Sequence, residues 1–272
     1  MAGKFGGRLA AYIVFLTLAA AACGYDAASN AMGPGYGVGD TMAVAALNAG
    51  PRVIAATGSL TRALAEFRAS LGGSVNLTAG EQSTGRREIN WDGVAGAVLN
   101  VNTFPGDFFN RVVFRGQIFT TEGTGFRVSD NALSDLNPAY ASQFAAFSPP
   151  KIFVAVGSQA LTVHFQVAGS TTPALVNGFG VVFTDVDKEG SATLAFFDSR
   201  GRLLKTVTAP VRSDAAGFSF VGATFSTPIV ARVRIVSGQA AITGLNSDIS
   251  AGGADDLVAM DDFITGEPHA IR

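Results

Sequence analysis

Apolar runs alternate with turn residues most clearly in NGFGVVFTDVDKEGSATLAFFDSRGRLLKTVTAP, which spans Asn177 to Pro210. The first run, Phe179 to Val186, meets an acidic turn that a glycine closes. A second run covers Ala192 to Phe197, and the turn DSRG leads into a third, Leu203 to Thr208. Short runs bounded by turn residues are typical of β-strands. The stretch therefore predicts three strands joined by two tight turns.

The same pattern continues toward both ends of the chain. In LTVHFQVA, apolar residues alternate with Thr162, His164 and Gln166, which predicts a strand in a sheet with one solvent-exposed face. Many short strands with short connections favour an all-β fold, a jelly-roll β-sandwich. Further strand-like runs are Phe114–Thr121, Gly125–Ser129, Ile152–Val156, Phe218–Phe225, Ile229–Val236, Ala241–Leu245 and Leu257–Ile264.

One short helix is expected before the sandwich. Leu60, Leu64, Phe67 and Leu71 recur at helical spacing, with Ser59 as a candidate N-cap and two glycines after Leu71 as the stop. Its apolar face is expected to pack on the β-domain, and docking to a partner is the alternative.

Charge and hydropathy limit the classes of partner. Lys and Arg total 19 against 21 for Asp and Glu, and they form no cluster suited to a phosphate backbone, so nucleic acid is not an expected partner. Mean hydropathy is +0.32. After the N-terminal segment, no apolar stretch approaches the roughly 18 residues of a spanning helix, so any membrane contact is expected through a lipid anchor alone.

The N-terminus has the form of an export signal. Lys4 and Arg8 precede the apolar segment Tyr12 to Ala22, and the single cysteine, Cys23, follows four alanines. This context resembles a bacterial lipobox, in which the cysteine is lipidated and becomes the mature N-terminus. We therefore expect a lipoprotein in the periplasm or on the cell surface. The alternative is ordinary signal-peptide cleavage, which would give a secreted protein.

The chain is expected to fall into four parts. Residues 1–23 form the signal peptide with its lipobox-like cysteine, and residues 24–50, rich in Ala, Gly, Ser and Asn, form a flexible tether. Residues 51–84 form a short helical lead-in, and residues 85–268 form the β-sandwich. With only one Cys, no disulfide can form within the chain, so stability must come from the core.

The densest polar cluster, GRREINWDGV, contains Trp91, the one tryptophan of the chain. A tryptophan face can stack on a sugar ring, so Trp91 and the adjacent Asp92 are candidate ligand-binding residues. The alternative is that Trp91 packs in the core with its N–H group satisfied by a hydrogen bond.

The loop TDVDKEG resembles the start of a calcium loop of the form D-x-D-x-[DN]-G. Asp185, Asp187 and Glu189 have the spacing of its first three ligands, and Gly190 has the position of its sharp turn. Strands flank the loop, and the later bidentate acid is missing, so it is not an EF-hand. Asp185 and Asp187 are candidate Ca²⁺ ligands, and a hairpin turn with solvated acids is the alternative.

A second acidic pair, Asp261 and Asp262, lies in the last predicted strand, within MDDF. Neighbouring strand residues point to opposite faces, so one carboxylate is expected to face inward and to need a partner. First and last strands are often neighbours in a jelly roll, which would bring this pair near Asn90 and Asp92. A structural calcium ion held between them is therefore a further candidate, with Arg or backbone N–H groups as the alternative partners.

No catalytic motif stands out. The two histidines, His164 and His269, lie near neither a cysteine nor a G-x-S-x-G turn. Carboxylates are numerous enough for the acid pair of a glycosidase, but sequence spacing cannot show that two of them converge. A catalytic role is therefore the less favoured expectation.

The strand motifs also resemble a known group of proteins. GFGVVFTDVD, LAFFDSRGRLL, FSFVGATF, IVARVRI and VAMDDF occur in the order found in uncharacterised exported bacterial modules, many of which carry PEP-CTERM-type sorting tails. GRREINWDGV, FPGDFFN and GTGFRVS resemble the upstream half of the same proteins. The resemblance covers about Gly85 to Pro268. It implies a galactose-binding or concanavalin-like sandwich and brings no catalytic residues.

These observations favour an exported, lipid-anchored protein of the cell envelope whose sandwich binds an extracellular ligand without catalysis. A glycan is the first choice of ligand, because jelly rolls with an exposed sheet face often bind sugars, and structural calcium is the expected cofactor. The alternatives are a carbohydrate-active hydrolase or lyase that uses paired carboxylates, and a purely structural envelope component.

Overall fold

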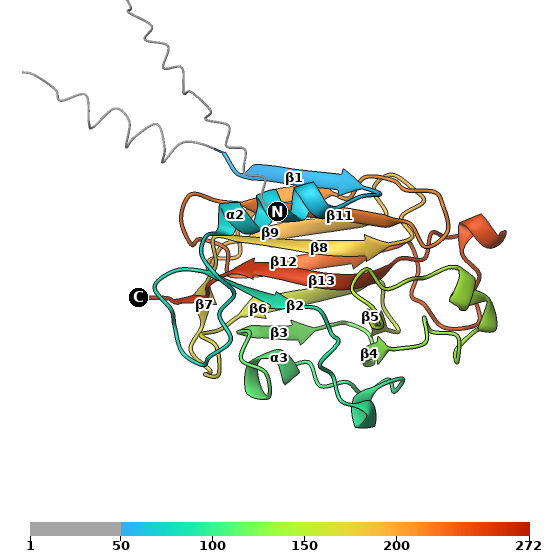
Figure 1. Cartoon of the computed structure of the whole chain (residues 1–272), viewed down its shortest axis with the longest axis horizontal. Helices are drawn as coiled ribbons and strands as arrows, with labels where there is room; N and C mark the ends of the chain where they lie inside the picture. The colour runs from blue at the N-terminus through green and yellow to red at the C-terminus, as the bar shows by residue number, and fades with distance from the viewer. Residues whose placement is uncertain (1–49) are drawn as a thin grey trace, which may run out of the picture. The chain divides into compact units, whose positions relative to one another are not determined.

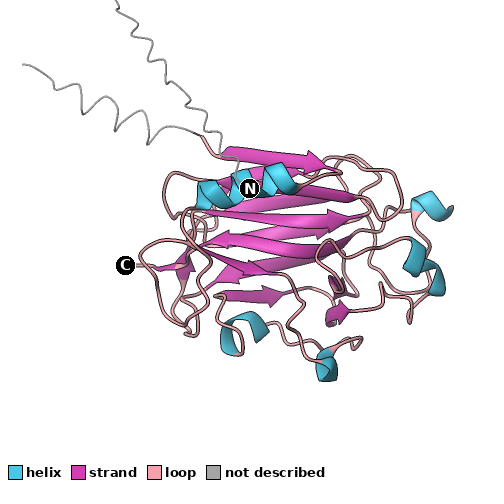
Figure 2. Ribbon diagram, viewed as in Figure 1, coloured by secondary structure: helices cyan, strands magenta, loops and turns pink. Residues whose placement is uncertain are grey.

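The computed structural model describes residues 50–272, so the predicted signal peptide, Cys23 and nearly all of the predicted tether lie outside the described residues. Strands make up most of the regular structure (Figures 1 and 2), and two α-helices and three 3₁₀ turns accompany them. The strands are β1 (Arg52–Thr57), β2 (Arg86–Ile89), β3 (Gln117–Thr120), β4 (Gly125–Ser129), β5 (Ile152–Val156), β6 (Ala160–Phe165), β7 (Ala174–Leu175), β8 (Gly178–Thr184), β9 (Ala192–Phe197), β10 (Leu203–Thr208), β11 (Phe218–Thr224), β12 (Arg232–Ser237), β13 (Ala259–Gly266) and β14 (His269–Ala270). The helical elements are α2 (Thr61–Leu71), α3 (Phe108–Arg111), η1 (Gly96–Val98), η2 (Pro138–Ser142) and η3 (Ile249–Ala251).

The strand order is that of a jelly roll. The 7-stranded sheet contains the sequence β5-β13-β8-β11, and the 5-stranded sheet contains β6-β12-β9-β10. Between β5 and β13 the chain therefore passes back and forth between the two sheets, and only β9 and β10 follow one another within one sheet as a hairpin. The predicted all-β jelly-roll sandwich with one short N-terminal helix is confirmed.

The main core lies between the two sheets. Phe179, Val181 and Phe183 of β8 face Val163 of β6 and Leu194 of β9 within one buried apolar cluster. The two sheets nevertheless differ in burial. β8 and β13 are buried at every position, whereas β6 and β9 alternate between buried and partly exposed residues. The larger sheet is therefore covered on both faces, and the smaller sheet has one face toward solvent.

Helix α2 covers part of the outer face of the larger sheet (Figure 1), as its apolar spacing predicts. Phe67 packs edge-on against Phe220, and its ring lies over the paired residues Gly180 and Gly222. A Cβ at Gly222 would come within 2.6 Å of that ring, so glycine makes room for the helix. The expected cap at Ser59 is wrong: the N-cap residue is Leu60, and no side chain caps this end.

The lead-in segment contributes more than a helix. Its first residues form β1, which pairs along its whole length with β11 at the edge of the larger sheet. Strand β2 pairs with the second half of β13, so an early and a late strand are neighbours, as expected. The run Ala241–Leu245 forms no strand, but Ile242 is buried with Tyr140 and Leu257 in a separate apolar cluster beside β5.

A buried ion pair joins β2 to the residue that follows β13. The guanidinium group of Arg87 donates to both carboxylate oxygens of Glu267, at 2.9 and 2.6 Å, and both side chains are almost fully buried. Arg87 also donates to the backbone oxygens of Thr78, Gly80 and Phe114. The pair thus fixes the loop before β2 to the end of β13.

None of the helices in residues 50–272 combines the length and apolar character that crossing a bilayer would need.

Candidate metal centre

Carboxylates from separate parts of the chain meet in the loops beyond the end of β8. Asp185 and Asp187 follow that strand directly, and Asp248 begins η3. One oxygen from each of the three lies within 4.8 Å of the others. Asp256, just before β13, adjoins Asp187. We call these four residues the acidic cluster.

Asp185 points inward because the chain turns as it leaves β8. Its φ of 70° is in the left-handed region, which Asp tolerates better than most residues, and its N–H donates to the oxygen of Gly217. The side chain is fully buried. Oδ2 accepts a hydrogen bond from Gln143, whereas Oδ1 has no hydrogen-bond partner.

Asp248 is held by its own loop. Its Oδ2 accepts hydrogen bonds from the backbone N–H (2.6 Å) and the hydroxyl (2.7 Å) of Ser250, and its Oδ1 accepts one from the N–H of Leu257 (2.7 Å). The amide of Gln143 also donates to the Ser250 hydroxyl at 2.8 Å. A chain of hydrogen bonds thus connects Asp185, Gln143, Ser250 and Asp248.

The other two carboxylates are less well satisfied. Asp256 is fully buried; its Oδ2 accepts from the N–H groups of Asp187 (3.0 Å) and Lys188 (2.8 Å), and its Oδ1 has no partner. Neither carboxylate oxygen of Asp187 has a hydrogen-bond partner, although both are buried. Together with Asp185 Oδ1, four carboxylate oxygens of the acidic cluster therefore lack a donor.

The acidic cluster also lacks a compensating cation. Within residues 50–272, no Lys or Arg nitrogen lies within 4.0 Å of its carboxylates. Burial raises the pKa of Asp185 to about 8, against the hydrogen bond from Gln143, and the charges of Asp248 and Asp187 raise it further. Burial, followed by the charge of Asp248, raises the pKa of Asp187 to about 6, and burial also raises the pKa of Asp256. The folded protein therefore needs protons or a cation at this point.

This arrangement can hold a metal ion. The converging ligands are carboxylate oxygens, which suit hard divalent cations rather than the softer metals that Cys and His bind. Asp185 and Asp187, the candidate ligands predicted from the sequence, both belong to the acidic cluster, whereas Glu189 is exposed and is not part of it. Asp248 and Asp256 were not singled out, since only the tertiary fold brings them to the loop after β8.

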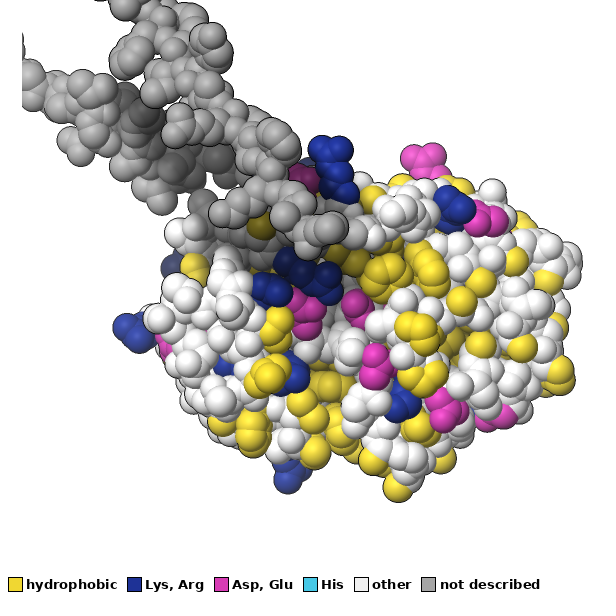
Figure 3. Space-filling model, viewed as in Figure 1, with side chains coloured by type: hydrophobic (Ala, Val, Ile, Leu, Met, Phe, Trp, Pro, Cys, Tyr) yellow, Lys and Arg dark blue, Asp and Glu magenta, His cyan; other side chains and the backbone are white. Residues whose placement is uncertain are grey.

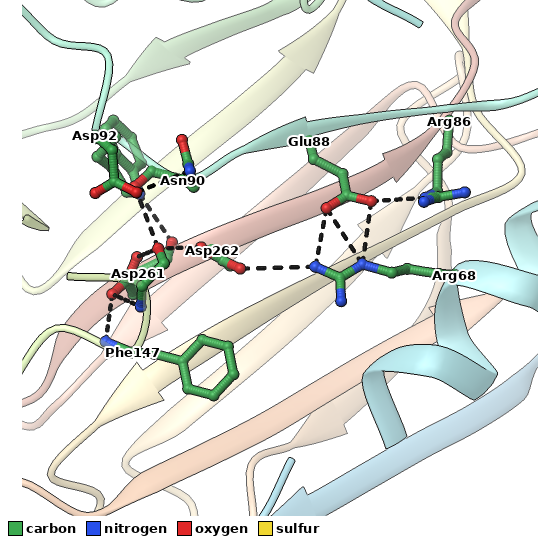
Figure 4. A network of polar contacts seen from close by, with 10 residues as sticks. Arg68, Arg86, Glu88, Asn90, Asp92, Phe147, Asp261 and Asp262 are labelled. Atoms are coloured by element: carbon green, nitrogen blue, oxygen red, sulfur yellow. Dashed lines mark hydrogen bonds and ion pairs between the residues drawn. The ribbon is translucent and has the colours of Figure 1, made fainter. Parts of the chain in front are cut away.

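Asp261 and Asp262 belong to a different network (Figure 4), and the expectation that they lie on opposite faces is wrong. The pairing of β13 with β8 is irregular between Met260 and Phe263, and at this bulge both carboxylates turn toward Ser148. The Ser148 hydroxyl lies 3.1 Å from Asp261 and 2.7 Å from Asp262. Burial, followed by the charge of Asp262, raises the pKa of Asp261 to about 8.

Protein donors satisfy this pair. The N–H groups of Phe147 and Ser148 donate to Asp261 at 2.6 and 3.1 Å, and Arg68 lies 3.8 Å from Asp262. Neither residue belongs to the group of three possible metal ligands in residues 50–272, so the structure adds no support for a calcium ion shared between them. Backbone and Arg donors, the alternative partners, contact both carboxylates.

The same network continues to α2. Figure 4 shows Glu88 between Arg68 and Arg86, whose closest nitrogen–oxygen distances to it are 2.9 and 2.6 Å. Burial alone would raise the pKa of Glu88, but hydrogen bonds from the two arginines outweigh it and lower the pKa. In Figure 3, acidic and basic side chains accordingly gather at the centre of the face that carries α2. These contacts tie α2, β2 and β13 together.

Trp91 lies in the core and is unavailable to a sugar. It is 1% exposed, stacks on Phe153 with ring centroids 4.0 Å apart, and donates its indole N–H to the backbone oxygen of Asp261 at 2.9 Å. The ligand-binding expectation for Trp91 is therefore corrected in favour of core packing. Asp92 is half-buried; its Oδ2 accepts from Asn90 at 2.8 Å, its Oδ1 has no partner, and burial raises its pKa.

Comparisons with known proteins assign neither a family nor a function to the chain. No protein-family model matches the sequence, and no curated protein matches it significantly. Among solved structures, the chain is similar to the enzymatically active domain of tailspike protein 4 from bacteriophage CBA120, with 17% identity and a TM-score of 0.27. That match covers 64% of this chain and 22% of the tailspike chain. At this TM-score it supports no argument about the site.

Proposed function

We propose that this chain is an exported, non-catalytic protein of the cell envelope whose jelly-roll domain binds Ca²⁺ at the acidic cluster and binds an extracellular glycan. The observation that carries the calcium proposal is the set of buried carboxylate oxygens of Asp185, Asp187 and Asp256 that have no donor. A divalent cation would supply the missing partner and would offset the repulsion between the carboxylates.

The irregular set of ligands favours calcium over smaller ions. Ca²⁺ binds oxygen at about 2.3–2.6 Å and accepts irregular geometry, so two ligands on opposite sides of it are nearly 5 Å apart. Oxygens of Asp185, Asp187 and Asp248 that lie within 4.8 Å of one another fit that span. Mg²⁺ requires near-ideal octahedral geometry, which carboxylates from separate loops are less suited to supply.

The proposed role of the ion is structural. Its ligands come from the loop after β8 and from η3, and Asp256 fixes the adjoining segment before β13. Gln143 connects the site to η2. One ion would therefore hold several loops at one end of the sandwich. Extracellular calcium modules work with dissociation constants of about 10⁻⁴–10⁻³ M, so moderate affinity would suffice for an exported protein.

The proposals of export and lipid anchoring rest on residues 1–23 and on the resemblance to exported bacterial modules. Lipidation of Cys23 would make it the mature N-terminus and place the protein in the periplasm or on the cell surface, whereas simple cleavage would release a secreted form. The mass of the N-terminal peptide from the native host distinguishes these fates. A diacylated Cys23 supports the anchor, and an unmodified mature N-terminus contradicts it.

The glycan proposal is supported by the solvent-exposed face of the smaller sheet, since Trp91 is unavailable to a sugar. A paired-acid hydrolase would need two carboxylates facing each other across a cleft. Asp261 and Asp262 instead converge on Ser148 within the protein, so this alternative gains no support from them.

Calorimetric titration of Ca²⁺ into the metal-free protein tests the calcium proposal. Asp187→Asn should weaken binding at least about tenfold, because it removes one charged ligand that no protein donor satisfies. The matched control is Asp107→Asn, since Asp107 is an exposed side chain that pairs only with Arg111. Absence of calcium binding, or equal binding by all three proteins, would contradict the proposal.

A further inference from the structure

The exposed face of the smaller sheet contains three adjacent cavities, which we call together the groove. Its central cavity, of about 470 Å³, lies over β3, β6 and β12. A second cavity, of about 230 Å³, shares Thr120 with it, and a third, of about 470 Å³, shares Ile118 and Gln166. These shared lining residues place the second and third cavities beside the central one, an arrangement that suits an extended chain better than a compact small molecule.

Strand register places a defined row of side chains across the groove. Arg232 of β12 lies directly opposite Phe197 of β9 on one side and His164 of β6 on the other, and His164 lies opposite Ile118 of β3. Two positions further along β12, Arg234 lines the second cavity. Both arginines therefore face the groove from one strand, because alternate strand residues share a face.

Arg232 offers a positive charge that the protein does not neutralise. Its guanidinium carbon lies 4.5 Å from the centroid of the Phe197 ring, an arrangement that orients the group and leaves its edge free. Among residues 50–272, no carboxylate lies within 4.0 Å of either Arg232 or Arg234. Asp198, the acidic residue of the central cavity, pairs with Arg202 instead, at 3.1 Å.

The rest of the lining contains polar, apolar and acidic groups. Glu122 lines the second cavity, and Asp107 lines the third beside Arg111, with which it pairs at 3.1 Å. The Thr120 hydroxyl lies 3.1 Å from Nε2 of His164, and the Gln166 carbonyl accepts from Asn110, which leaves the Gln166 amide N–H groups available. Ile118 and Pro173 provide apolar surface in the same cavity. Sugars present hydroxyl groups around the ring and C–H groups on its faces, so this lining matches a saccharide.

We infer that the groove is the glycan site of this protein and that it binds an acidic polysaccharide, one whose sugars carry carboxylates. The guanidinium groups of Arg232 and Arg234 would pair with sugar carboxylates, for which their planar fork is well suited. Thr120, His164 and Gln166 would bind the hydroxyls. This inference rests on the glycan part of the proposed function and is independent of the calcium part.

Affinity electrophoresis of the purified protein through gels that contain polygalacturonate, alginate or hyaluronan tests this inference. EDTA in the gel prevents calcium from bridging protein and sugar, and the matched controls are the carboxyl-reduced, uncharged forms of the same polymers. The acidic forms should retard the protein and the reduced forms should not. Added salt should weaken the retardation, because exposed charges are screened.

Substitutions of Arg232 test whether the acidic polysaccharide binds in the groove. Arg232→Gln should weaken affinity on the order of tenfold, and Arg232→Lys should weaken it less, because a point charge remains without the fork. The control is Arg52→Gln, an exposed arginine at the edge of the other sheet. Unchanged melting temperatures would show that the variants fold.

Three outcomes would overturn the inference. Equal retardation by the reduced polymers would refute recognition of charge but leave the glycan proposal intact. Acid-dependent retardation that Arg232→Gln does not change would place the site elsewhere. Retardation by no polymer would refute both the groove and the glycan proposal, whereas calcium titration at the acidic cluster would still decide the metal proposal.

Discussion

Asp185 and Asp248 place carboxylate oxygens within 4.8 Å of each other, although one residue follows β8 and the other begins η3. Gln143 and Ser250 connect them through hydrogen bonds, but Asp185 Oδ1 accepts none. Two buried like charges this close are unfavourable unless a proton or a cation lies between them. The stability of this end of the sandwich should therefore depend on what occupies the acidic cluster.

Asp185→Asn should stabilise the metal-free protein and remove its response to calcium. The pKa of Asp185 is raised to about 8, so at neutral pH folding in EDTA must take up a proton at a cost on the order of a few kcal/mol. Asparagine is already neutral and avoids that cost. Urea unfolding in EDTA and in calcium measures both effects. A variant less stable in EDTA, or one that calcium still stabilises, would contradict this account.

Asp261 should make the metal-free protein less stable as the pH rises. Its pKa is raised from 3.8 to about 8 in the folded state, so the folded protein keeps a proton that the unfolded chain has lost. The contribution of Asp261 to the stability of the folded protein is therefore complete below about pH 4, and it is lost as the pH rises through about 8. The free energy of unfolding, measured in EDTA from pH 5 to pH 9, should show this loss of stability.

Asp261→Asn is the matched variant for that pH series. The substitution should reduce the slope of the free energy of unfolding against pH by up to about 1.4 kcal/mol per pH unit, the value for one proton. Asp185 contributes a slope of the same sign, so some pH dependence should remain in the variant. An unchanged slope would mean that Asp261 is ionised in the folded protein.

Glu267→Gln should be among the most destabilising conservative changes, by about 3–5 kcal/mol, because it leaves the buried charge of Arg87 without its partner. The control is Glu66→Gln, which breaks the exposed contact with Arg52 and should cost less than about 1 kcal/mol. Chemical unfolding measures both. Similar losses in the two variants would argue against a buried ion pair.

Trp91 should report directly on the core. It is the one tryptophan of the chain and is 1% exposed, so its fluorescence should be blue-shifted in the folded protein and should move to the red on unfolding. Trp91→Ala should cost about 3–5 kcal/mol. Leu245→Ala, at a side chain that is 97% exposed, should change stability by less than about 0.5 kcal/mol. Emission typical of water-exposed indole would contradict the core position.

Much of the fold could be predicted from local pattern. The runs Ile152–Val156, Ala192–Phe197 and Leu203–Thr208 are strands with the predicted bounds, because clear turn residues flank them. Strand β1, RVIAAT, has no clear strand pattern, because it lies at a sheet edge and only Ile54 among its residues is buried. The run Ala241–Leu245 is apolar for another reason: Ile242 fills a cluster outside the sandwich.

The candidate site could be predicted only in part. Asp185 and Asp187 share one turn, so local spacing revealed them, whereas Asp248 and Asp256 reach the site through tertiary structure alone. The expected orientation of Asp261 and Asp262 assumed a regular strand, and a β-bulge is not visible in residue types. Trp91 could not be assigned to core or surface by composition.

Thermal unfolding of the purified protein, in EDTA and with calcium at a hundredfold excess over its dissociation constant, tests the central claim most directly. Binding to the folded state should add about 2.7 kcal/mol and raise the midpoint by about 5–10 °C. Asp187→Asn should reduce the rise at the same calcium concentration to about half or less, as expected for binding weakened at least tenfold, and Asp107→Asn should preserve it. An equal midpoint in EDTA and calcium would contradict the account and leave the acidic cluster neutralised by protons alone.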